Sequence, residues 1–245
     1  MDVMTTSRGL RAAVDRRSFL LAATVGPMAL AAGERPTGAA ASQPRELPVI
    51  GRAAWGALKP RDGLIPHTPR RLTLHHSGVR LDSDADSPGR LRIHQRWHMN
   101  EKGHPDIDYH FVVDRRGHVF QGRNPRFRGD TQTDYDPTGH FLVCCEGDYQ
   151  GSSGRAQVPT RAMLRSVTLL FAAAAQRWDI DPGTLQGHRD YTTMTSCPGG
   201  QLERLVRNGS LQESVTELLA AGPVRWRRLA RPEARATVAR IESGA

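Results

Sequence analysis

Short apolar runs typical of strands alternate, between residues 49 and 221, with longer segments that have the spacing of amphipathic helices. Strand-like runs occupy 70–76, 141–147 and 184–190, and residues 109–123 hold two such runs around Asp-Arg-Arg-Gly, typical of a hairpin. Helical patterns occupy 88–99, 160–178 behind an expected Thr160 cap, 201–207, and a segment opened by the capping-box sequence Ser-Leu-Gln-Glu at 210–213. The alternation predicts an α/β fold with a single domain, in which a central mixed β-sheet is flanked by helices.

The first 32 residues have the pattern of a secretory signal peptide. Arg16 and Arg17 precede an apolar run from Phe19 to about Ala32, which is shorter than the roughly 20 apolar residues of a membrane span. The paired arginines followed by Ser-Phe-Leu-Leu resemble a twin-arginine export signal, with an ordinary Sec signal as the alternative. We therefore expect export to the periplasm or the outside, with no stable membrane anchor.

The segments that flank the domain differ from it in composition. Residues 33–48 are rich in Gly, Pro, Ala and Ser, which predicts a flexible linker before a domain at 49–221. Residues 222–245 carry many arginines and are expected to form a basic tail, either a solvated helix or an arm that contacts a wall or membrane. The formal net charge of +9 suggests an anionic partner, but a general arginine bias explains it equally well.

Histidine and cysteine side chains gather at the ends of the predicted strands. His75 and His76 close one strand, His188 closes another, and Cys197 follows in the adjoining loop. Two imidazoles and a thiolate, with a position left open for water, are a plausible catalytic zinc set. Cys197 as a nucleophile with His188 as its base is the alternative. Cys144 and Cys145 lie in a strand-like run and are expected to be small core residues without disulfides.

Four segments occur in one order along the chain: AAWGALKP (53–60), LTLHHSG (72–78), HMNEKGHPDIDYHFVVDRRGHVFQGR (98–123) and GHRDYTTMTSCPGG (187–200). Together they resemble the peptidoglycan recognition protein and N-acetylmuramoyl-L-alanine amidase family, the type 2 amidases, over about residues 49–207. The resemblance implies a zinc ion at the floor of a surface groove. Its implied ligands are His75, His188 and Cys197, and its implied catalytic residues are Tyr109 and Thr195.

The resemblance also implies the partner and the reaction. Peptidoglycan or muropeptides would be the substrate, and the amide between N-acetylmuramic acid and L-alanine would be hydrolysed. Arg123 is the candidate contact for a stem-peptide carboxylate, and His98 is a second candidate substrate contact. A recognition protein that binds peptidoglycan without cutting it is the alternative, although the retained Cys197 favours the enzyme. We expect a monomer that does not bind nucleic acid.

The chain departs from the family pattern at several positions. Asp108 stands where the family has Gly, and His104 stands where it usually has Trp. Asn-Pro-Arg-Phe follows Gly122-Arg123 in place of the Gly-Trp of many relatives, which leaves the choice between lysine and diaminopimelate stems open. The spacing from His188 to Cys197 is one residue longer than the common one, so the loop that carries Thr195 must bulge.

Overall fold

The structure is a computed structural model that describes residues 45–152 and 154–245. The expected signal peptide at 1–32 and the expected linker up to residue 44 lie outside the described residues. The described part holds a seven-stranded sheet with the order β6-β2-β5-β3-β4-β1-β7. Its strands are β1 (Arg45–Ile50), β2 (Arg71–His76), β3 (Phe111–Val113), β4 (Val119–Gln121), β5 (His140–Cys145), β6 (Gln186–Gly187) and β7 (Val224–Arg228).

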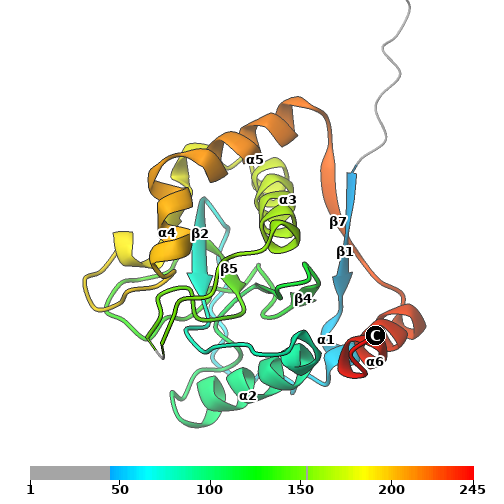
Figure 1. Ribbon diagram of the computed structural model, residues 1–245. Coiled ribbons are helices and arrows are strands. Elements are labelled where there is room, and N and C mark those ends of the chain that lie inside the picture. Colours follow the sequence, from blue (N-terminus) through cyan, green and yellow to red (C-terminus); the bar gives the residue numbers. More distant parts are fainter. Residues whose placement is uncertain (1–44, 153) are drawn as a thin grey trace, which may run out of the picture. The chain divides into compact units, whose positions relative to one another are not determined.

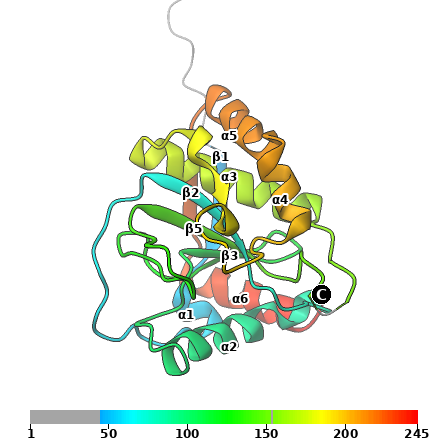
Figure 2. The ribbon, with the colours of Figure 1, turned by 90° about the vertical axis from the view of Figure 1, so that its left-hand side faces the viewer.

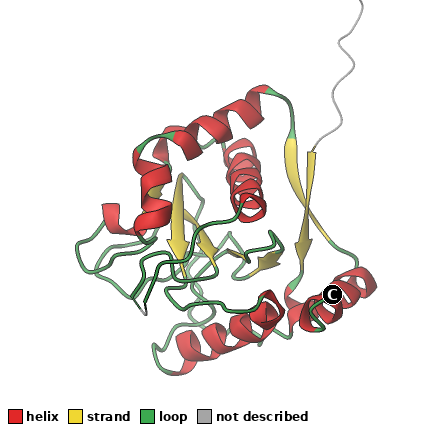
Figure 3. Ribbon diagram, viewed as in Figure 1, coloured by secondary structure: helices red, strands yellow, loops and turns green. Residues whose placement is uncertain are grey.

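Helices cover both faces of this sheet (Figures 1 and 3). They are α1 (Arg52–Trp55), α2 (Ser87–Asn100), α3 (Arg161–Trp178), α4 (Gly200–Arg207), α5 (Ser210–Ala220) and α6 (Arg231–Glu242), with short 3-10 turns at Asp84–Asp86, Pro182–Thr184 and His188–Asp190. One core cluster packs α3, α4 and α5 against the sheet, and a second packs α1, α2 and α6 against the other face. The rotated view in Figure 2 shows the sheet between these two layers. The predicted α/β architecture with a mixed sheet is confirmed.

The pairing of the strands explains which face carries the polar residues of β2. β2, β5 and β3 are parallel neighbours, whereas β3 and β4 form the predicted antiparallel hairpin. Leu72 and Leu74 point into the α3 core, so the alternation of a strand places His75 on the opposite face. His75 lies in register with Cys144, which belongs to the core cluster on the α2 side. His75 therefore lies at the end of β2 on the face of the sheet that α2 covers.

Both predicted boundaries of the domain need correction. β1 begins at Arg45, so the expected linker to residue 48 overlaps a strand. The basic tail expected at 222–245 is part of the domain, because β7 pairs with β1 along its whole length and α6 buries Ala234, Val238 and Ile241. These three residues recur at the spacing of one helix face, and the arginines around them hid that pattern.

The predicted helix caps had different outcomes. Thr160 caps α3 as expected, because its side chain accepts a hydrogen bond from the Met163 backbone N–H. The capping box expected at Ser210 does not form. α5 starts instead after Gly209, whose φ of 79° lies in the left-handed region that glycine adopts without strain. Among the described residues, no helix is long and apolar enough to cross a membrane.

Candidate active site

Three predicted ligands meet at one point although they come from distant segments. His75 ends β2, His188 follows the short strand β6 that pairs with β2, and Cys197 lies in the loop before α4. One ligand atom from each of these buried residues lies within 4.8 Å of the other two. The His75 Nδ1–Cys197 Sγ distance is 3.6 Å. Two such ligands on a tetrahedral zinc ion, with bonds of about 2.0 and 2.3 Å, are separated by about 3.5 Å, close to the observed distance.

The electrostatics of this cluster also fit a metal ion. Burial lowers the pKa of His75 well below its usual range and lowers the pKa of His188 to about 4, so both imidazoles are in the neutral form that binds metals. Burial raises the pKa of Cys197 to about 12, and a bound cation would reverse that effect. Nε2 of His75 is buried without a hydrogen-bond partner among the described residues. The donor set fits zinc, with His75, His188 and Cys197 as its holders.

The same surroundings do not favour a cysteine nucleophile. A reactive thiolate needs a lowered pKa, whereas burial raises the pKa of the Cys197 thiol. The Cys197 thiol is buried, and its Sγ accepts a hydrogen bond from the His76 backbone N–H at 3.3 Å. His188 Nε2 is engaged with the Thr133 hydroxyl at 2.9 Å. The neighbouring His76 side chain points away and accepts from the Tyr149 N–H.

The cluster lies at the floor of a groove with a volume of about 520 Å³. Its walls come from α2, from the loop after β2, from residues 130–133 and from residues 194–197. Tyr109 and Thr195, the two predicted catalytic residues, both line this groove. The sequence-predicted metal and catalytic residues are therefore brought together in one place.

Tyr109 and Thr195 both offer hydroxyl groups next to the cluster. The Tyr109 ring lies 5.4 Å from the His75 ring, and burial raises its pKa well above the usual range, so the hydroxyl stays protonated. The Thr195 Oγ1 accepts a hydrogen bond from the Cys197 N–H at 3.1 Å. No acceptor for the Thr195 hydroxyl proton is found in the described part of the chain.

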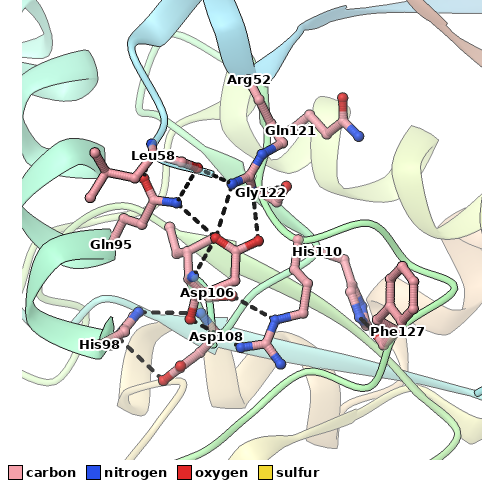
Figure 4. Close-up of polar contacts among 12 residues, drawn as sticks. Arg52, Leu58, Gln95, His98, Asp106, Asp108, His110, Gln121, Gly122 and Phe127 are labelled. Atoms are coloured by element: carbon pink, nitrogen blue, oxygen red, sulfur yellow. Dashed lines mark hydrogen bonds and ion pairs between the residues drawn. The ribbon is translucent and has the colours of Figure 1, made fainter. Parts of the chain in front are cut away.

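A buried network fixes the segment that carries Tyr109 (Figure 4). The Asp106 carboxylate accepts hydrogen bonds from both terminal nitrogens of Arg52, at 2.8 and 3.0 Å, and from the Gln95 amide at 2.7 Å. It also accepts from the Ile107 N–H at 2.8 Å. Arg52 and Gln95 come from α1 and α2, so the network ties these helices to the loop in front of β3. Asp106 lies in the 98–123 segment that carries the family resemblance, but the sequence alone indicated no role for it.

Arg123, which was predicted to contact substrate, has its guanidinium occupied inside the protein. Arg123 is only 1% exposed and does not line the groove. It donates hydrogen bonds to the carbonyls of Asp106, Ile107 and Arg128, and its Nη2 lies 2.6 Å from the Asp130 carboxylate. Arg123 therefore stabilises the loops around Tyr109.

His98 lines the groove, but both of its ring nitrogens are occupied. Nδ1 accepts from the Asp108 N–H at 3.2 Å, and Nε2 lies 3.3 Å from Asp108 Oδ2 (Figure 4). A neutral imidazole carries one proton, so Nε2 donates it to this carboxylate. Burial lowers the pKa of His98 to about 4, which keeps the ring neutral. His98 can offer substrate the edge and face of its ring, and no free nitrogen.

Two of the departures from the family pattern, His104 and Asp108, contact each other. His104 Nδ1 lies 2.6 Å from Asp108 Oδ1, and this hydrogen bond raises the pKa of His104. With Asp130 they form a second group of metal-ligand type, all within 4.8 Å. His98 and His104 contact the Asp108 carboxylate through ring nitrogens, and the Arg123 guanidinium forms an ion pair with Asp130. This group therefore forms a hydrogen-bonded support beside Tyr109.

Sequence reasoning also missed the groove loop at 130–133. Thr131, Gln132 and Thr133 line the groove, and Thr133 contacts His188. The loop has no hydrophobic periodicity and carries no motif, so the only usable signal was its position between a hairpin and a strand. His94 of α2 also lines the groove, and its Nε2 lies 3.2 Å from the buried Glu146 carboxylate.

The fold, the groove and the His-His-Cys cluster define a protein of the peptidoglycan recognition and amidase class. The chain belongs to the N-acetylmuramoyl-L-alanine amidase family, whose sequence profile matches residues 66–200. This confirms the resemblance that the four motifs indicated.

The individual relatives include proteins named as recognition proteins and proteins named as amidases. Peptidoglycan-recognition protein SD of Drosophila simulans is 26% identical over 166 residues, which cover 66% of this chain and 86% of that protein. Human N-acetylmuramoyl-L-alanine amidase is 32% identical over 163 residues, which cover 64% of this chain but only 27% of the human protein. The solved complex of a Drosophila PGRP-LB mutant with tracheal cytotoxin has a TM-score of 0.56 at 26% identity and covers 64% of this chain and 92% of that chain. Family membership alone therefore does not decide between cleavage and recognition.

Proposed function

We propose that this protein is a zinc-dependent hydrolase that cleaves the amide between N-acetylmuramic acid and L-alanine of peptidoglycan. The observation that carries the proposal is the buried set of His75, His188 and Cys197, whose ligand atoms lie within 4.8 Å of one another in a groove with Tyr109. A module that only binds peptidoglycan has no need of these three ligands. The solved relative in complex with tracheal cytotoxin, a monomeric diaminopimelic-acid-type peptidoglycan, supports the substrate class.

A bound zinc ion would supply a Lewis acid and would acidify a water molecule far below its usual pKa. The protein's own residues would supply the hydrogen-bond donors that the reaction needs. The Tyr109 hydroxyl, held protonated by burial, donates a hydrogen bond to the amide oxygen as negative charge develops on it. The free proton of the Thr195 hydroxyl is placed to bond the same oxygen or the departing amine.

The groove also suits a substrate that mixes sugar and peptide. Ile93, Trp97 and Met194 line it and are 56%, 40% and 63% exposed, which is unusual for large apolar side chains. They offer apolar contact surface on two walls of the groove, one formed by α2 and the other by residues 194–197. We propose that a substrate held against these walls has its amide bond positioned over the cluster, as hydrolysis of an unstrained bond requires.

The test compares two cysteine variants. Cys197→Ser is expected to lose both bound zinc and the release of new amines from a muropeptide, because one of the three ligands is gone. Cys145→Ala removes a buried thiol from the core on the other sheet face and should keep zinc and activity. Zinc is measured as metal per chain and activity by amine labelling. Full zinc and full activity in Cys197→Ser would refute the ligand set. Muropeptide binding by the zinc-loaded protein without any new amine would instead identify a recognition protein.

We also propose that the chain is exported, through the twin-arginine route. The paired Arg16 and Arg17 before an apolar run that ends near Ala32 support this proposal. Export would bring the enzyme to the compartment in which peptidoglycan lies.

A further inference from the structure

Thr133 makes a contact that the family motifs do not include. Its Oγ1 lies 2.9 Å from His188 Nε2, and it donates a hydrogen bond to Thr131 Oγ1 at 3.2 Å. Both threonines belong to the loop that lines the groove. The Thr133 hydroxyl therefore sits between a proposed metal ligand and a second hydroxyl.

The directions of these hydrogen bonds determine the tautomer of His188. A threonine hydroxyl has one proton, and that of Thr133 is used toward Thr131. With Thr133 as the donor to Thr131, its oxygen is left to accept a proton from His188 Nε2. A neutral imidazole carries a single N–H, so Nδ1 is left with a free lone pair.

Aromatic rings hold the orientation of the same imidazole. The Tyr135 ring meets the His188 ring edge-on with a centroid distance of 5.2 Å and an interplanar angle of 62°. The His75 ring lies 4.7 Å away, centroid to centroid. Rotation of His188 about its side-chain bonds would break the Thr133 contact and press on one of these rings.

We propose that Thr133 is a positioning residue that holds His188 in the Nε2–H tautomer and so presents Nδ1 to the metal. This inference rests on the proposed metal site. It identifies Nδ1 as the metal-binding nitrogen of His188, and it gives the 130–133 loop a role in metal binding. His75 has no comparable support, because its Nε2 lacks a hydrogen-bond partner among the described residues. Thr133 is therefore the side chain through which the loop controls affinity for the ion.

The first test measures zinc affinity in the full chain by competition with a chromogenic chelator. Thr133→Val keeps the shape of the side chain and removes the hydroxyl, and it should weaken zinc binding about 10- to 100-fold, the usual effect of losing such a partner. Thr133→Ser restores the hydroxyl and should restore the affinity. Thr138→Val removes an exposed hydroxyl that bonds only Asp136 and should change nothing. Wild-type zinc affinity in Thr133→Val would overturn the inference.

The second test uses the zinc-free protein, so that it does not depend on the metal site. Long-range ¹⁵N NMR of the histidine rings should show His188 protonated at Nε2 in wild type and in Thr133→Ser. Thr133→Val should show a mixture of tautomers. Protonation at Nδ1 in wild type would refute the proposal. If wild type binds no zinc, the proposed function fails, whereas the tautomer measurement still decides whether Thr133 orients His188.

Discussion

Replacing Asp106 by alanine should destabilise the protein strongly, because this buried carboxylate pairs with the half-buried Arg52. The Asp106 side chain is 2% exposed and that of Arg52 is 18% exposed, with 2.8 Å between Oδ2 and Nη1. Removing one partner of a buried ion pair costs about 3–5 kcal/mol. Arg52 keeps hydrogen bonds to the carbonyls of Gly122 and Leu58, so we expect the lower end, about 3 kcal/mol. In a domain of this size that loss lowers Tm by roughly 6–12 °C.

The assay is equilibrium urea unfolding followed by tryptophan fluorescence, with Asp82→Ala as the matched control. Asp82 also pairs with an arginine, Arg80, but their side chains are 77% and 45% exposed. An exposed pair contributes little, so this control should change the free energy of unfolding by less than about 1 kcal/mol. Equal losses in Asp106→Ala and Asp82→Ala would refute the account of the Asp106 network.

Further predictions concern the site, the histidines and export. Tyr109→Phe should lower kcat by roughly 10²-fold with little change in KM, as measured on a muropeptide, because one donor to the developing oxyanion is lost; an unaltered kcat would remove Tyr109 from the mechanism. Arg123→Gln should lower the urea midpoint without a selective rise in KM. A rise in KM with an unchanged urea midpoint would instead support the prediction that Arg123 contacts substrate. Burial lowers the pKa of His110 from 6.5 to about 3, so His110 binds a proton more readily in the unfolded chain than in the folded one. The free energy of unfolding should therefore fall as pH drops below about 6.5. A urea midpoint that is equal at pH 7 and pH 5 would contradict this prediction. Replacing Arg16 and Arg17 by lysine should trap precursor in the cytoplasm, and unchanged secretion in a fractionation assay would indicate an ordinary Sec signal.

The parts of the site that could be predicted from the sequence are those that local patterns encode. β5 has a continuous apolar run, β2 alternates leucines with polar residues, and the Gly-His-Arg-Asp and Ser-Cys-Pro segments stand in a recognisable order. These features located His75, His188 and Cys197 without any knowledge of the sheet order. The structure adds that β6 pairs with β2, which is what brings the three residues together.

The features of the site and fold that the sequence did not predict share one physical cause, which is that burial depends on tertiary packing. Arg123 follows a hairpin strand, where most arginines are solvated, yet three backbone carbonyls and Asp130 surround it. The arginines of β7 pair with Glu46 on one face of an edge strand while Trp226 packs on the other, so composition concealed a strand. Thr133 lies in a loop whose contact with His188 spans 55 residues of sequence.

The most direct test of the proposed function identifies the bond that the zinc-loaded protein breaks. Purified peptidoglycan is digested, new amines are labelled, and the products are read by mass spectrometry together with an assay for reducing ends. The amidase chemistry predicts new N-terminal alanine and intact glycan strands, and Cys197→Ser should release neither alanine termini nor sugars. New reducing ends would show a glycosidase, and new amines on internal stem residues would show an endopeptidase. Either result, or binding without any new amine, would contradict the proposed hydrolysis of the muramic acid–alanine amide.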